Sequence, residues 1–186
     1  MTGLLLASTS PQRCAILEQL GLEFDVVAPA YDEHDDGLAP VEAVRVHALG
    51  KARSVAGLAE GRPVIGIDTT VVLDGRAYGK PASPGEAAAT LAALAGRGHD
   101  VVSGLCVLGE GFEEVAHDTT RVVFRPLTEL EIAGYVETGE WEGRAGAYAI
   151  QGRGAELVER IEGDYLNVVG LPAALLLRVL RRHSTR

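Results

Sequence analysis

The stretch Leu4-Leu5-Leu6-Ala7-Ser8-Thr9-Ser10-Pro11-Gln12-Arg13 joins a run of aliphatic residues to the start of a helix. The aliphatic run 4–7 predicts a buried β-strand. Ser10 stands at a favoured N-cap position and Pro11 at the first helical position, so a helix is expected from Pro11 to about Leu20. A strand that passes directly into a helix is the first unit of an α/β arrangement.

Predicted strands and helices alternate through the rest of the chain, without repeats, low-complexity tracts or linkers. The expected strands cover residues 24–28, 63–67, 71–73, 76–78, 101–108 and 115–124. The expected helices cover 41–58 and 172–182, and two more open at Ser83–Glu86, read as a capping box, and at Thr128–Glu131. This order predicts one α/β domain over residues 1–186.

Composition narrows the function classes. The chain has 186 residues, a formal net charge of −9, 47% hydrophobic and 5% aromatic residues. An acidic chain with few aromatic residues is not typical of a nucleic-acid-coating protein. Only two cysteines are present, and we find no basic signal-peptide start and no apolar run long enough for a membrane span. We therefore expect a cytoplasmic protein with no membrane or nucleic-acid partner.

Several stretches resemble known binding motifs but lack a residue that each motif requires. Residues 75–81 resemble a phosphate-binding P-loop, but the spacer is one residue short and Pro81 stands where a Ser or Thr hydroxyl is needed. Residues 32–37 imitate the start of an EF-hand, but Ala43 occupies the position of the bidentate Glu. Residues 152–154 lack the third glycine of a dinucleotide site, and no histidines stand at zinc-ligand spacing.

Two charged residues stand where structure alone would not prefer them. Asp68 closes the predicted strand 63–67, and the carboxyl end of such a strand is where ligands bind in open α/β sheets. A turn cap is an equal alternative for Asp68. Arg13 lies in the first turn of its helix, where the dipole disfavours a cation. It indicates either an anionic ligand or an ion pair with Glu18 or the acidic loop 31–37.

Two lysines also admit two interpretations. Lys51 lies seven residues after Val44, so both fall on nearly the same, apolar helix face. Lys51 is then either an edge residue or a charge directed into a site. Lys80 stands between Gly79 and Pro81, which favours a positioned ammonium group over an ordinary solvated loop lysine.

Glu33 and Gln151 complete the candidate set. Glu33 is one acid of four in the loop 31–37, and most such acids are simply solvated. Gln151 follows an apolar stretch, so we expect a buried amide that either ties loops together or reads a ligand. Two acids, three cations and an amide, without an activated Ser or Cys nucleophile, indicate metal-assisted hydrolysis of a phosphate ester or anhydride.

Five stretches, in this order along the chain, resemble the Maf family of nucleoside triphosphate pyrophosphatases. They are Leu6-Ala7-Ser8-Thr9-Ser10-Pro11-Gln12-Arg13, Ile67-Asp68-Thr69-Thr70-Val71, Gly79-Lys80-Pro81, Ala145-Gly146-Ala147-Tyr148-Ala149-Ile150-Gln151-Gly152 and Asn167-Val168-Val169-Gly170-Leu171-Pro172. The resemblance implies an elongated mixed-sheet α/β fold with two lobes around a central cleft, related to inosine triphosphate pyrophosphatases. It also implies hydrolysis of a nucleoside triphosphate between its α and β phosphates, and a homodimer.

The resemblance further implies roles for individual residues. Asp68 is the expected catalytic acid that accepts a proton from the attacking water. Glu33 and Asp68 are expected to hold a divalent metal, Mg²⁺ or Mn²⁺. The expected phosphate-binding residues are Ser8, Arg13, Lys51 and Lys80.

Three positions bear on the base that is recognised. In the family branch that cleaves dTTP and UTP, two arginines follow the Ser-Pro, a Thr follows the catalytic Asp, and a Gln precedes the glycine. Thr69 and Gln151 match this pattern, whereas Gln12 replaces the first arginine. We therefore expect dTTP and UTP as substrates, with CTP or modified nucleotides accepted alongside. The alternative is a nucleotide-binding regulator of cell division with little turnover, against which the presence of both Asp68 and Glu33 weighs.

Overall fold

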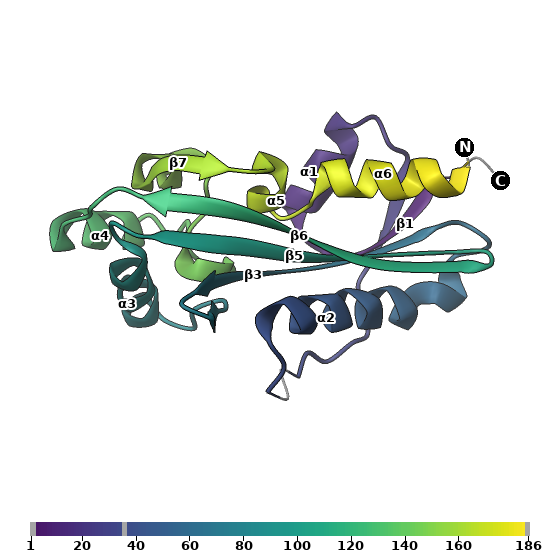
Figure 1. Ribbon diagram of the computed structural model, residues 1–186, viewed down its shortest axis with the longest axis horizontal. Helices are drawn as coiled ribbons and strands as arrows, with labels where there is room; N and C mark the ends of the chain where they lie inside the picture. Colours follow the sequence, from purple (N-terminus) through teal and green to yellow (C-terminus); the bar gives the residue numbers. More distant parts are fainter. Residues whose placement is uncertain (1–2, 35–36, 185–186) are drawn as a thin grey trace. The chain divides into compact units, whose positions relative to one another are not determined.

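The computed structural model describes residues 3–34 and 37–184, and its elements are labelled in Figure 1. The strands are β1 (Leu4–Ala7), β2 (Phe24–Val27), β3 (Val64–Leu73), β4 (Arg76–Tyr78), β5 (Gly98–Gly109), β6 (Phe112–Phe124) and β7 (Val158–Glu162). The α-helices are α1 (Pro11–Gln19), α2 (Pro40–Val55), α3 (Pro84–Leu94), α4 (Glu129–Val136), α5 (Tyr165–Val169) and α6 (Ala173–Ser184). Short 3₁₀ helices cover η1 (Ala56–Leu58), η2 (Ala145–Ala147) and η3 (Gly152–Leu157).

The strands form one mixed sheet in the order β2-β1-β3-β5-β6-β7, with β4 paired to β3. β1 is parallel to both β2 and β3, and its pairing with β3 runs from Leu5 opposite Val64 to Ala7 opposite Gly66. β4 is antiparallel to β3, and β7 is antiparallel to β6. The α/β class and the mixed sheet expected from the sequence are confirmed.

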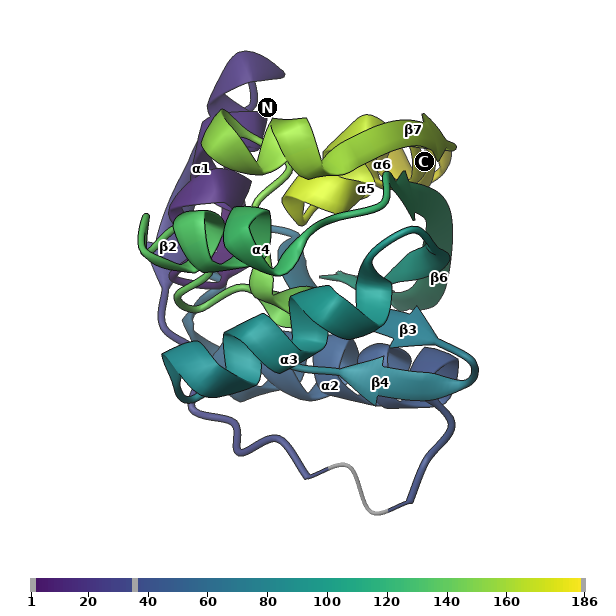
Figure 2. The same cartoon turned by 90° about the vertical axis from the view of Figure 1, so that its left-hand side faces the viewer.

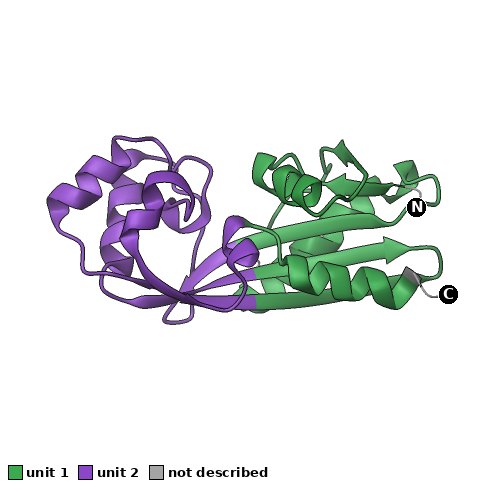
Figure 3. Cartoon of the chain, turned by 90° about the horizontal axis from the view of Figure 1, so that it is seen from above, with its two compact units in different colours: residues 1–69, 103–118, 170–186 green, residues 70–102, 119–169 purple. Residues whose placement is uncertain are grey.

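The chain divides into two compact units, shown in Figure 3. Unit 1 comprises residues 1–69, 103–118 and 170–186, and unit 2 comprises 70–102 and 119–169. Because β3, β5 and β6 each contribute residues to both units, neither unit is a continuous piece of chain. A single domain over residues 1–186 stays a prediction.

In unit 1, α2 covers one face of the sheet, while α1 and α6 lie on the other (Figure 1). Two strand glycines let α2 approach closely. A Cβ atom on Gly66 would lie 2.1 Å from the carbonyl oxygen of Ala48, and one on Gly104 would lie 2.1 Å from that of Val44. No larger residue fits at either position, so α2 is held directly against β3 and β5.

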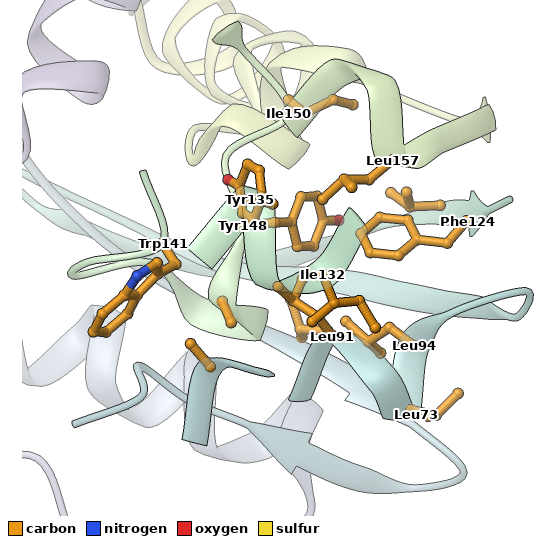
Figure 4. Packing of buried hydrophobic residues seen from close by; sticks show 14 of the residues in the cluster. Leu73, Leu91, Leu94, Phe124, Ile132, Tyr135, Trp141, Tyr148, Ile150 and Leu157 are labelled. Carbon is orange, nitrogen blue, oxygen red and sulfur yellow. The ribbon is translucent and has the colours of Figure 1, made fainter. Parts of the chain in front are cut away.

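In unit 2, α3 and α4 lie side by side (Figure 2) and cover a core of large side chains. Figure 4 shows Phe124, Tyr135, Tyr148 and Leu157 packed together in that core. The ring of Tyr148 meets that of Phe124 nearly edge-on, with 4.8 Å between centroids. Such tilted aromatic pairs are favourable beyond the area that they bury.

Most predicted helices and strands are confirmed within a few residues, but two local predictions are wrong. Ser10 is confirmed as the N-cap residue of α1, although its side chain makes no cap bond and its hydroxyl donates to Gln12 Oε1 (3.2 Å). The capping box at Ser83 is half formed. Its hydroxyl accepts from the amide of Glu86, but the Glu86 carboxylate accepts from Ala82 rather than from the cap residue.

The second wrong prediction concerns the strand at Asp68, which continues to Leu73 instead of ending there. The β-branched residues that follow Asp68 favour extended backbone and carry the strand into its hairpin with β4. The Asp74–Gly75 turn of that hairpin is confirmed, with positive φ at both residues (52° and 77°). Of the helices in the described residues, none combines the length and the apolar character that crossing a bilayer requires.

Candidate active site

Ser8 and Arg13 meet where β1 passes into α1. Ser8 is buried, and its Oγ accepts hydrogen bonds from the amide of Ser10 (3.3 Å) and from Arg13 Nη1 (3.0 Å). Arg13 also donates from Nε to the carbonyl of Gly170 (2.9 Å) and from Nη2 to Thr69 Oγ1 (3.3 Å). The guanidinium thereby joins β1, β3 and the segment before α6.

Arg13 is held mainly by neutral oxygens. Its contacts in the described part of the chain include no ion pair with Glu18 or the loop before residue 35, so the ion-pair alternative is not supported there. Asp35 and Asp36 lie outside the described residues. Burial lowers the pKa of Arg13, while the charges of Asp68 and Glu33 raise it. Arginine nevertheless remains protonated in proteins. The positive charge of Arg13 is therefore available to attract an anion between the end of β1 and the start of α1.

Lys51 joins the two candidate acids. Its Nζ lies 2.6 Å from Glu33 Oε1 and 2.6 Å from Asp68 Oδ1. The Lys51 and Asp68 side chains are 9% and 13% exposed, whereas Glu33 is 49% exposed. Of the two alternatives for Lys51, its burial and its contacts with both acids favour a charge directed into a site over an edge residue, and the two carboxylates converge on a single positive charge.

The position of Asp68 follows from the register of the sheet. β3 pairs with β1 only as far as Gly66, opposite Ala7. Asp68 therefore lies just past the carboxyl end of β1, although it is inside β3. Ligands bind at such a place in open α/β sheets. Asp68 is therefore still suited to bind a ligand, although β3 continues beyond it. The turn-cap alternative is excluded, because no turn follows Asp68.

Tyr31 and His47 hold the loop that carries Glu33, and sequence reasoning missed both. Tyr31 Oη lies 3.0 Å from Nδ1 of His47, a buried residue of α2. The Tyr31 ring occupies the space beside Gly50, where a Cβ atom would approach it to 2.1 Å. A glycine directly before Lys51 in a helix was the available signal, because glycine in a helix interior is unfavourable without a packing reason.

Ser103 was also missed. Its Oγ lies 2.9 Å from Thr69 Oγ1, so Thr69 is held between Ser103 on β5 and Arg13 on α1. A serine inside the apolar strand was the signal, since buried hydroxyls need partners.

The carboxylates of Glu33 and Asp68 fit a hard divalent cation. They already share one cation, the Lys51 ammonium, at hydrogen-bond distance. The described residues contain no cluster of three or more His, Cys, Asp or Glu side chains. Two carboxylates suffice for Mg²⁺ when a bound phosphate and water supply the remaining oxygens, and Mn²⁺ accepts similar ligands.

Lys80 and Gln151 belong to unit 2 and are both exposed. The prediction of a buried Gln151 is wrong, because the turn at Gly152 (φ 66°) brings the residue to the surface. The segments that carry the two residues are tied together by a hydrogen bond from the amide of Gly146 to the carbonyl of Gly79 (3.2 Å). Neither side chain has a hydrogen bond or ion pair to another described residue.

The fold and the charged cluster define an α/β protein with two acids and two cations at a strand end, a constellation suited to phosphate chemistry. A family model described as Maf-like protein matches residues 3–183. The chain therefore belongs to the Maf family.

Relatives and one solved structure extend this comparison. A protein of Pelotomaculum thermopropionicum named dTTP/UTP pyrophosphatase is 49% identical over 98% of this chain and 97% of its own length. One of Moorella thermoacetica with the same name is 50% identical over 92% of this chain and 90% of its own. The Staphylococcus aureus Ham1 structure matches with a TM-score of 0.46 and 18% identity over 66% of this chain and 72% of that one.

Proposed function

We propose that this chain is a nucleoside triphosphate pyrophosphatase, a hydrolase that acts on dTTP and UTP. It cleaves the anhydride between the α and β phosphates and gives a nucleoside monophosphate and pyrophosphate. The names of the relatives support the substrate. The observation that carries the proposal is the Lys51 ammonium held at 2.6 Å between Glu33 and Asp68.

Asp68 is the proposed catalytic residue. One of its carboxylate oxygens is oriented by Lys51, and the side chain keeps a small exposure through which water can reach it. It accepts a proton from the attacking water as the oxygen–phosphorus bond forms at the α phosphate. The bond to the bridging oxygen breaks in the same displacement, and pyrophosphate leaves with that electron pair.

Glu33 and Asp68 would hold the divalent metal, Mg²⁺ or Mn²⁺, which when bound supplies charge neutralisation for the triphosphate. We expect Lys51 to exchange its carboxylate partners for phosphate oxygens in the loaded enzyme. Ser8 and Arg13 stand ready as donors to phosphate at the start of α1, where the free amides also favour an anion. Lys80 is proposed as a further phosphate-binding residue.

Positioning and charge neutralisation account for this reaction, since anhydride cleavage demands little covalent chemistry from the protein. Thr69 and Gln151 are the proposed base-selecting residues together with Gln12. Thr69 is fixed by Arg13 and Ser103, whereas the Gln151 amide is free to bind. CTP and modified nucleotides are proposed as further substrates.

A nucleotide screen tests the proposal. Canonical and modified nucleoside triphosphates are incubated with the purified protein and Mg²⁺ or Mn²⁺, and pyrophosphate is scored separately from orthophosphate. We expect pyrophosphate with dTTP and UTP, abolished by a chelator. Orthophosphate alone would overturn the assigned bond, and tight binding without any product would favour the nucleotide-binding regulator of cell division.

The cellular setting belongs to the same proposal. We propose a cytoplasmic homodimer that binds a nucleoside triphosphate as its substrate. It would have no membrane or nucleic-acid partner. Cell fractionation and light scattering of the eluted protein would check the compartment and the mass. A strictly monomeric mass at micromolar concentration contradicts the dimer.

A further inference from the structure

Gln151 occupies an unusual position for a residue with a free side chain. It is the N-cap residue of the 3₁₀ helix η3, Gly152–Leu157, and its side chain makes no cap bond. The first amides of a helix have no partner within the helix and need one from outside. The N-cap side chain usually supplies that partner, so another group must do so here.

Glu140 supplies it from eleven positions upstream. Its Oε1 accepts the amide of Arg153 and its Oε2 accepts the amide of Gly154, each at 3.1 Å. A Cβ atom on Gly152 would lie 2.7 Å from Glu140 Oε1, so the glycine makes this approach possible. An ionised carboxylate that accepts two backbone amides forms strong, directional bonds.

The two bonds from Glu140 to the amides of Arg153 and Gly154, here called the Glu140 clamp, are anchored at the end of α4. The amide of Glu140 donates to Thr138 Oγ1 (3.1 Å), and that hydroxyl donates to the carbonyl of Tyr135 (2.6 Å). The Tyr135 hydroxyl in turn accepts the amide of Ala149 (3.0 Å). Tyr135 lies in the packed core of unit 2, beside Tyr148 (Figure 4). The backbone is therefore fastened on both sides of Gln151, at residue 149 and at residues 153–154.

We infer that Glu140 is a positioning residue for Gln151. The Glu140 carboxylate accepts the first free backbone amides of η3, which an N-cap side chain would otherwise accept. The side-chain amide of Gln151 therefore stays available while the backbone around it is fixed. This inference rests on the proposed function, because it assigns the free amide to reading the base of the nucleotide. An amide side chain carries both N–H donors and an acceptor oxygen, which suits the polar edge of a pyrimidine such as thymine or uracil, where donors and acceptors also occur side by side.

Glu140→Gln tests the inference, with Glu142→Gln as the matched control. The amide that replaces the Glu140 carboxylate keeps its shape but can accept only one of the two backbone amides. Glu142 is an exposed acid two residues away, and its substitution makes the same change of charge. We measure kcat and KM for dTTP, UTP and CTP, together with hydrogen exchange at the amides of Arg153 and Gly154.

For Glu140→Gln we expect faster exchange at those two amides and a higher KM for dTTP and UTP with little change in kcat. The preference for dTTP over CTP should fall by about 10-fold, because small misplacements of a binding group are costly. Glu142→Gln should change none of these quantities. In a Gln151→Ala background, Glu140→Gln should leave the preference unchanged, since no amide remains to be positioned.

The outcomes separate the possibilities. Faster exchange with an unchanged preference makes Glu140 a structural cap only and overturns the inference. Unchanged exchange at both amides overturns the clamp itself. A wild-type protein that hydrolyses no nucleotide defeats the proposed function, and with it the reading role, whatever the exchange shows.

Discussion

The candidate site residues of the two units differ in their contacts with the rest of the protein. In unit 1, the polar groups bind one another, as when the Lys51 ammonium bridges Glu33 and Asp68. In unit 2, the described structure gives the side chains of Lys80 and Gln151 no such partners, and contacts of the backbone hold their segments instead. A ligand that binds the unit 1 cluster would have to replace existing bonds, whereas a ligand that binds Lys80 or Gln151 would not. The same kind of substitution should therefore have different consequences in the two units.

The largest expected effect is that of Asp68→Asn. The substitution preserves shape and an acceptor for Lys51 but removes both the proton acceptor and a metal-binding charge. We expect kcat to fall by at least about 100-fold while triphosphate binding persists. Gln151→Ala should instead change KM and base preference with kcat nearly intact. Steady-state kinetics with a separate binding titration measures both, and equal losses of kcat would break the division between the units.

A second effect concerns acid stability and resides in unit 2. His99 is fully buried, and its Nε2 lies 2.9 Å from the Tyr148 hydroxyl. Burial first, and then the charge of Arg121, lowers the pKa of His99 to about 4, against a partial opposing effect of Asp100. The unfolded chain thus binds more protons between about pH 6.5 and 4. The contribution of His99 to the free energy of unfolding should be constant above pH 6.5 and should fall as the pH decreases from about 6.5 to 4.

The loss attributable to His99 should reach about 2 kcal/mol at pH 5. Urea unfolding of the wild type and of His99→Gln at pH 7 and pH 5 measures it, and the variant should show the smaller decrease. The titration of Glu131 does not contribute to the change in stability between pH 7 and pH 5. Hydrogen bonds from the backbone and side chain of Thr128, followed by that from Arg125, lower its pKa to about 2, so its contribution is lost only below about pH 4.5. Parallel losses in both proteins would rule His99 out.

The two lysines give the sharpest test of the comparison itself. Lys51→Ala leaves two carboxylates facing each other, which should cost about 2 kcal/mol of stability, less than the roughly 3–5 kcal/mol of a fully buried pair because Glu33 is half exposed. Lys80→Ala removes an exposed group and should change stability by less than about 0.5 kcal/mol. Both should lower kcat/KM by about 10-fold or more, as expected for a charged hydrogen bond to phosphate.

Thermal melts and kinetics of the two lysine variants, measured side by side, decide this point. A Lys80→Ala protein that melts far below the wild type, with its folded fraction fully active, would show a structural role. A Lys51→Ala protein of unchanged stability would show that the bridge between Glu33 and Asp68 does not hold the acids in place.

Local patterns predicted much of the fold and the core of the site. The spacing from Val44 to Lys51 placed the lysine on the buried face of α2, and the Asp74–Gly75 pair predicted its hairpin. These features depend on neighbours within a turn or two of chain. Asp68 could be singled out although its strand does not end there, because a carboxylate amid apolar residues needs a partner regardless of the strand boundary, and Lys51 is that partner.

What the sequence could not show are contacts between distant segments. The cap that Glu140 gives to η3 joins two segments that no local pattern connects. The exposure of Gln151 depends on the turn at Gly152, and the placement of Tyr31 over Gly50 depends on how the loop folds onto α2. Each is fixed by packing in three dimensions, which hydrophobic periodicity does not encode.

The smallest expected effect is a change of specificity at Gln12. This half-buried residue of α1 accepts a bond from Ser10 and directly precedes Arg13. Arginine there would add a fixed charge and several donors to unit 1, where polar groups already bind one another. Gln12→Arg should therefore narrow the substrate range toward dTTP and UTP.

We expect the kcat/KM ratio of dTTP to CTP to rise by about 3- to 10-fold in Gln12→Arg, since added contacts alter the relative transition-state energies of competing bases. Gln19→Arg, at the exposed end of the same helix, makes the same substitution away from the cluster and should leave the ratio unchanged. A larger ratio in Gln12→Arg alone would show that this position of α1 contributes to base selection. If rank order and spread stay the same in both variants, selection belongs to Gln151 and Thr69, and the departure at Gln12 has no bearing on the base.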